Sequence, residues 1–132
     1  MGRALVIFGI LACCTGGFAM QSGDAYLKRE GDRWTFGTAT IARVVALEDG
    51  KLLPKSFRAG VTGRELASPG AGAAEFAVEV GEDRTLVTSA SGGWKLVDAV
   101  AKKLALGELQ LDLVVQREGL RVTKSYVVYP QS

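Results

Sequence analysis

The alternation of hydrophobic and polar residues is clearest between Gly107 and Tyr129. Apolar and polar side chains alternate over 109–115, a break follows at 117–119, and the alternation resumes over 120–128. A period of two is typical of a strand with one face buried and one in water. Two such runs joined by a short glycine-containing turn predict a β-hairpin.

Shorter stretches with strand-like composition precede this hairpin. We expect strands at 26–29, 33–36, 38–47, 52–57, 75–80 and 84–88. Asp49-Gly50 predicts a tight hairpin turn, and Pro54, which lacks an N–H, predicts an edge strand. In the 75–80 stretch the alternation places Phe76 inward and Glu75 outward.

The stretch 94–106 fits two patterns. Val97, Val100 and Leu104 have helical spacing, whereas Trp94 and Leu96 begin an imperfect alternation. We expect a strand, because everything around it is predicted sheet. Glycine-rich loops at 58–74 and 89–93 separate about eight short strands, which predicts an all-β fold, an antiparallel β-sandwich over 24–132.

The first twenty residues have the layout of a secretory signal: Arg3, a short apolar run over 4–12, then small residues. The apolar run is too short to span a bilayer, which takes about 20 residues. Two processing sites fit, a cut after Ala19 (signal 1–19) or lipidation of Cys13 after a lipobox-like 10–13 segment. Both predict an exported protein, periplasmic or extracellular. A membrane contact is expected only through a lipid on Cys13, if the second site is used.

Composition removes several classes of chemistry. The chain has 132 residues, 16 Lys and Arg against 14 Asp and Glu, and no histidine. So balanced a charge gives no reason to expect a nucleic-acid partner. Without histidine, the commonest general base and metal ligand is missing. Both cysteines, Cys13 and Cys14, lie in the signal region, so the folded part has none for a disulfide or a thiolate metal site.

We find no catalytic residue, metal site or cofactor site in the remaining side chains. The carboxylate pairs, Glu48-Asp49 and Glu82-Asp83, fall in predicted turns and are expected to be solvated. The basic doublet Lys102-Lys103 is likewise expected on a solvated face. Substrate-binding residues stay unassigned.

Aromatic rings can stack on sugar rings or pack in a core. The candidates are Trp34, Trp94, Tyr126 and Tyr129. Tryptophan is on average largely buried, so we expect core positions for Trp34 and Trp94. Tyr129, beside Pro130, is expected to be more open.

Several segments together resemble the opening of bacterial alpha-galactosidases of the melibiase type. They are Trp34-Thr35-Phe36-Gly37, Ile41-Ala42-Arg43, the turn around Asp49-Gly50, Thr62-Gly63-Arg64-Glu65, and Val122-Thr123 through Tyr126 to Tyr129-Pro130. The sequence departs from the family pattern at Thr38, Ala42, Gly60 and Val61.

The resemblance implies a partial supersandwich of the galactose-mutarotase type, placed before a catalytic barrel that carries the two catalytic aspartates. It therefore implies a non-catalytic region of an exported glycoside hydrolase, with carbohydrate as its partner through that barrel. The alternative is a free-standing secreted or lipid-anchored carbohydrate-binding module. We expect no cofactor in either case.

Overall fold

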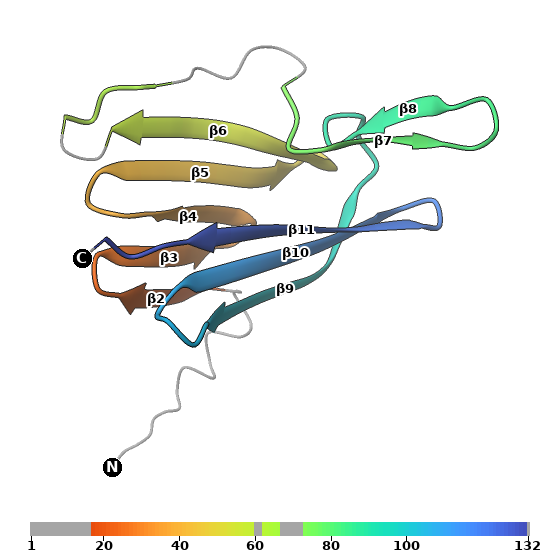
Figure 1. The fold of residues 1–132 in the computed structure, drawn as a ribbon. Coiled ribbons are helices and arrows are strands. Elements are labelled where there is room, and N and C mark those ends of the chain that lie inside the picture. The colour runs from red at the N-terminus through yellow and green to blue at the C-terminus, as the bar shows by residue number, and fades with distance from the viewer. Residues whose placement is uncertain (1–16, 60–61, 67–72, 132) are drawn as a thin grey trace.

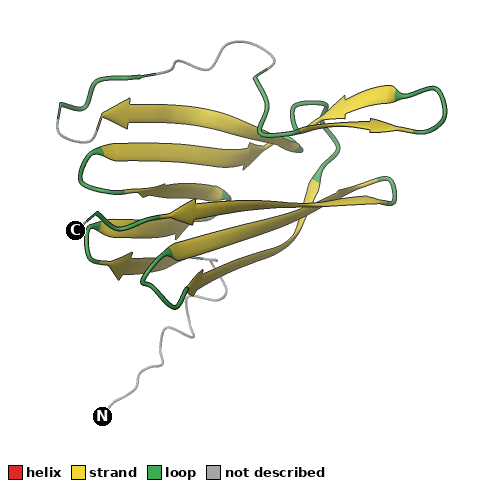
Figure 2. Ribbon diagram, in the orientation of Figure 1, coloured by secondary structure: helices red, strands yellow, loops and turns green. Residues whose placement is uncertain are grey.

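A computed structural model describes residues 17–59, 62–66 and 73–131, and over these residues the fold is all-β without a helix (Figure 2). The strands are β2 (Phe18–Ser22), β3 (Ala25–Glu30), β4 (Arg33–Gly37), β5 (Ile41–Glu48), β6 (Lys51–Ala59), β7 (Ala77–Val80), β8 (Thr85–Thr88), β9 (Lys95–Lys103), β10 (Leu109–Arg117) and β11 (Leu120–Val128). The expected all-β class is confirmed.

Five strands form the larger sheet, in the order β2-β3-β4-β5-β6, each antiparallel to its neighbours. The β5–β6 hairpin turns at Asp49 and Gly50, which have φ of 51° and 74°. Positive φ at both central positions is what a type I′ turn requires. Gly50 is also required by space, since a Cβ there would lie 2.7 Å from the Gly93 nitrogen. Pro54 lies in β6 at the sheet edge, as expected.

The second sheet has three strands, in the order β11-β10-β9. The predicted hairpin is confirmed, with Leu109 opposite Val128 and Arg117 opposite Leu120. The ambiguous stretch forms β9, so the expected strand is confirmed. A bulge between Val114 and Val115 shifts its register against β10.

The two sheets pack face to face (Figure 1). Tyr126 of β11 lies over Phe36 of β4, with ring centroids 4.9 Å apart. The core between the two sheets consists mainly of apolar side chains. Its most buried large side chains include Trp34, Leu27, Leu109, Leu111 and Leu113. We call this region, between β2–β4 and the three-stranded sheet, the covered core.

The hairpin of β7 and β8 forms a small third sheet beyond one end of the five-stranded sheet, near the turn end of β10 and β11 (Figure 1). It contributes to a second apolar cluster built on Val87, Trp94 and Val115. Phe76 meets Trp94 edge-on, with centroids 5.1 Å apart. This cluster covers one end of the β5–β6 hairpin, where Leu52 is fully buried.

The opposite end of β5 and β6 is less covered. Ile41 is 40% exposed, the Arg43 side chain is 35% exposed, and Phe57 is only partly buried. All three share the inner face with buried Phe36, because Arg43 pairs with Phe36 on one side and Phe57 on the other. We call Ile41, Arg43 and Phe57 the open corner. It exists because three strands lie over five.

Two expectations concern the N-terminal region. Cys13 lies outside the described residues, so its lipidation stays a prediction. The first described strand begins at Phe18, upstream of the expected domain start at Asp24. A cut after Ala19 would therefore fall inside β2, which pairs along its length with β3.

Candidate functional site

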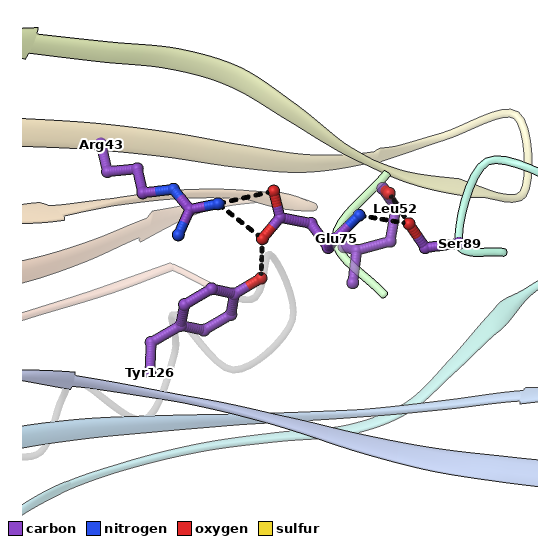
Figure 3. Close-up of polar contacts among 5 residues, drawn as sticks. All are labelled: Arg43, Leu52, Glu75, Ser89 and Tyr126. Carbon is purple, nitrogen blue, oxygen red and sulfur yellow. Dashed lines mark hydrogen bonds and ion pairs between the residues drawn. The ribbon is translucent and has the colours of Figure 1, made fainter. Parts of the chain in front are cut away.

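Among the described residues, Glu75 is the one buried carboxylate, and its side chain is 1% exposed. Arg43 Nη2 donates hydrogen bonds to both carboxylate oxygens, each at 2.8 Å. The Tyr126 hydroxyl donates a third, 2.5 Å long, to Oε1 (Figure 3). A buried carboxylate is stable only when paired and hydrogen-bonded in this way.

Ser89 fixes the backbone on the other side of Glu75. The Glu75 N–H donates to Ser89 Oγ at 2.7 Å, and Ser89 Oγ donates to the Leu52 carbonyl at 2.6 Å (Figure 3). The Leu52 N–H in turn donates to the Ser89 carbonyl at 2.9 Å. Ser89 is itself fully buried. We call Arg43, Glu75, Ser89 and Tyr126 the Glu75 cluster; it joins β5, β6, β11 and the β7–β8 region.

The placement of Glu75 corrects the sequence analysis, which put it on the solvent side of a strand. The strand begins only at Ala77, and Glu75 lies in the bend before it. Strand alternation therefore does not apply to Glu75. No local sequence signal marks it, because its partners Arg43 and Tyr126 come from strands 32 and 51 residues away.

The electrostatics of the cluster keep Tyr126 protonated. Burial raises the pKa of the Tyr126 phenol, and the hydrogen bond to Glu75 and its negative charge raise it further. The Arg43 guanidinium carbon and Lys124 Nζ each lie 5.5 Å from the centre of the Tyr126 ring. Lys124 forms no ion pair among the described residues.

This arrangement holds sheets together and is poorly suited to proton transfer. Both Glu75 oxygens are occupied, and a general base needs a free oxygen within reach of substrate. The nearest charged group with open surface is Arg43, which can still bind an anion through its remaining nitrogens.

Arg43 lies at the boundary of a groove of about 270 Å³ between the five-stranded sheet and β11. Most of the lining is apolar, with polar groups at the ends; the lining residues are Phe36, Gly37, Thr38, Ile41, Arg43, Phe57, Val127, Val128, Tyr129 and Gln131. The groove includes the open corner. Gln131 closes one end, since its N–H donates to Asp24 at 2.7 Å and its side-chain amide to Thr40 at 3.1 Å.

The aromatic candidates divide into buried and exposed residues as expected. Trp34 and Trp94 are 0% and 2% exposed, so both are core residues, and Tyr126 is buried. Tyr129 is 65% exposed and lines the groove. The structure thus buries Tyr126 and both tryptophans and leaves Tyr129 on the groove.

The charged candidates are exposed as expected, although Glu48 is the last residue of β5 and does not lie in the turn. The Glu48-Asp49 and Glu82-Asp83 pairs are exposed, as is the Lys102-Lys103 doublet. Within residues 17–59, 62–66 and 73–131 no group of three His, Cys, Asp or Glu side chains is arranged to hold a metal ion. The same residues include no helix with the length and hydrophobicity to cross a bilayer.

No family model, curated protein or solved structure matches this chain. The geometry of the groove and of the Glu75 cluster is therefore the basis for any functional assignment.

Proposed function

We propose that this chain is a non-catalytic β-sandwich region of an exported glycoside hydrolase of the alpha-galactosidase type. In this proposal it is part of a galactose-mutarotase-like supersandwich and supports or caps the sugar pocket of a catalytic barrel. The observation that carries the proposal is the open corner: a five-stranded sheet covered by three strands, with a groove along the uncovered part.

The open corner supports a role as a packing surface. Ile41 and Phe57 face the same side as the covered core, but no described strand lies over them. Burying apolar side chains contributes about 25 cal/mol per Å². A further layer over this corner would therefore be stabilised by contacts that the described residues leave unmade.

The placement of the described carboxylates supports a non-catalytic role. Glycoside hydrolysis uses two carboxyl groups on either side of the scissile bond. Among the described residues, both oxygens of the buried Glu75 carboxylate are hydrogen-bonded, and the adjacent pairs Glu48-Asp49 and Glu82-Asp83 are exposed.

Two measurements on the purified chain test this proposal. It should release no nitrophenol from a synthetic alpha-galactoside, and it should bind a hydrophobic dye through the open corner. An Ile41→Thr, Phe57→Thr double variant should lose most of the dye signal, whereas a Val97→Thr, Val100→Thr variant on β9 should keep it. Turnover of the galactoside would contradict the non-catalytic assignment, and unchanged dye binding in the first variant would contradict the packing surface.

A free-standing carbohydrate-binding module is the second candidate, and exposed Tyr129 favours it. The ring lies on the groove with Arg43, Thr38 and Gln131 near enough to supply polar contacts. Sugar C–H faces stack on such rings. Titration of tyrosine fluorescence with galactosides should then show saturation that Tyr129→Ala removes; no saturation for the unaltered chain would eliminate this candidate.

A further inference from the structure

The groove lies along a strand edge that has no partner among the described residues. β11 pairs with β10 on one side only, and none of its backbone groups hydrogen-bonds elsewhere in the described chain. An unpaired strand edge presents a row of N–H and C=O groups to which another extended chain can bind. Figure 1 shows β5 and β6 continuing past this edge, in the other layer.

The turn identifies which backbone groups are free. Glu118 and Gly119 have φ of 47° and 83°, a two-residue type I′ turn that closes on the pair Arg117 and Leu120. Hydrogen-bonded pairs alternate along an antiparallel hairpin from that point. The groups directed away from β10 therefore belong to a set of alternate residues: Arg121, Thr123, Ser125 and Val127.

The side chains beside this edge specify what would bind. Val128 and Tyr126 face inward, so an added strand would place its own inward side chains next to them, over the open corner. The place beside Val128 is apolar. The position beside Tyr126 lies near two positively charged groups. The Arg43 guanidinium carbon and Lys124 Nζ are each 5.5 Å from the centre of the Tyr126 ring.

The two cations differ in how they are paired: Arg43 binds Glu75, whereas Lys124 has no described anionic partner. Only Nη2 of Arg43 contacts Glu75, and the Arg43 side chain is 35% exposed. A carboxylate entering beside Tyr126 would reach both through charge-assisted hydrogen bonds.

We propose that the free edge of β11 binds an extended acidic polypeptide segment as an additional strand. An inward apolar side chain of the segment fills the groove at Ile41 and Phe57, and an inward carboxylate two residues away binds Arg43 and Lys124. The inference identifies the partner of the packing surface proposed above. It rests on that surface being uncovered and does not depend on any sugar.

The first experiment measures binding of a synthetic peptide to the whole chain. The peptide has about eight residues, a usual strand length, with Thr alternating with inward Val and a central Glu. Its fluorescently labelled form should show saturable polarisation. The matched peptide with Gln in place of Glu should bind about tenfold more weakly, the loss of one charge-assisted contact.

Backbone pairing is tested with N-methylated peptides. Methyl groups on alternate residues block the N–H groups of one side of a strand only. One series should lose binding and the other should keep it, and the series that is lost gives the strand direction. Equal binding by both series would overturn the proposal, because side-chain capture alone does not distinguish the two sides.

Two substitutions test the protein side. Thr123→Pro removes an outward N–H and should abolish binding, whereas Thr123→Ala keeps the N–H and should bind normally. Lys124→Gln should weaken binding of the Glu peptide about threefold and leave binding of the Gln peptide unchanged. A purely structural role of Lys124 would not produce this coupling. Circular dichroism of each variant checks that it is folded.

Amide hydrogen exchange gives a readout on the unaltered chain. The peptide should slow exchange at the four outward residues of β11 and leave the free edge of β9 unchanged. Protection of the same amides without peptide, rising with protein concentration, would show a second copy on the edge and overturn the proposal. Absence of peptide binding to the folded chain would do the same while leaving the galactoside and dye tests of the proposed function intact.

Discussion

The covered core and the open corner belong to the same sheet face and have opposite character. In the covered core, Leu27, Trp34 and Leu111 are completely buried among mainly apolar side chains. At the open corner the inner face carries a charged side chain, Arg43, and a partly exposed isoleucine, Ile41. The Glu75 cluster connects the two regions, because Glu75 binds Arg43 of the open corner and Tyr126 of the core.

The difference shows how a sheet face that is not fully covered stays folded. A three-stranded layer cannot bury a five-stranded one, so Ile41 and Phe57 stay partly exposed where the layer ends. Paired polar groups accompany them: Arg43 and Tyr126 bind Glu75, and Ser89 binds β6. Paired polar groups tolerate partial exposure, which a run of leucines would not.

The strongest test of this contrast is to remove equivalent side-chain volume from each region. Leu111→Ala should lower the free energy of unfolding by about 2–5 kcal/mol, because it leaves a cavity in a closed core. Ile41→Ala should cost about 1 kcal/mol or less, since much of the side chain is already in water. Urea denaturation measures both, and equal costs would show that the corner is covered in solution.

Glu75→Gln tests how much the Glu75 cluster contributes to stability. The amide has the same shape but cannot accept charge-assisted bonds from both sides, so we expect a loss of about 1–3 kcal/mol. Glu79→Gln on the neighbouring strand is the control, and its exposed pair with Arg84 should contribute about 0.5 kcal/mol or less. A Glu75→Gln variant as stable as its control would mean that the cluster does not hold the sheets.

Alkaline pH should destabilise the Glu75 cluster before the covered core. The folded-state pKa of Tyr126 is raised above its ordinary value of about 10, chiefly by burial, so the protonated phenol favours the folded state. This contribution is complete below about pH 10 and is lost as pH rises through the folded pKa. The unfolding free energy should therefore fall above pH 10, and Tyr126→Phe should show a shallower fall; identical slopes would contradict the assignment.

The smallest expected effect is at the end of the groove. The backbone N–H of Gln131 lowers the pKa of the Asp24 carboxyl below its ordinary value, with a further contribution from Ala39. The stabilisation is present above the unfolded pKa of about 3.9 and is lost as pH falls through the folded pKa. An NMR titration should show the lowered pKa, and Gln131→Pro, which removes the N–H, should raise it towards the ordinary value.

Much of the fold follows from the sequence. The hairpin at 109–128, the Asp49-Gly50 turn and the edge position of Pro54 depend on local patterns, and the structure has all three. The candidate site could not be found in this way. Glu75 lies outside its strand, and its contacts join residues far apart in sequence, so alternation alone assigned it to the wrong side.

The two tryptophans give the molecule a spectroscopic reporter in each of its apolar clusters. Trp34 lies in the covered core with an indole N–H that has no described partner, whereas the Trp94 indole donates to the Thr88 carbonyl at 2.9 Å. Their emission should therefore differ in wavelength. Replacing either one with phenylalanine isolates the signal of the other, so that denaturation curves reveal whether the β7–β8 end melts together with the main sheets or ahead of them.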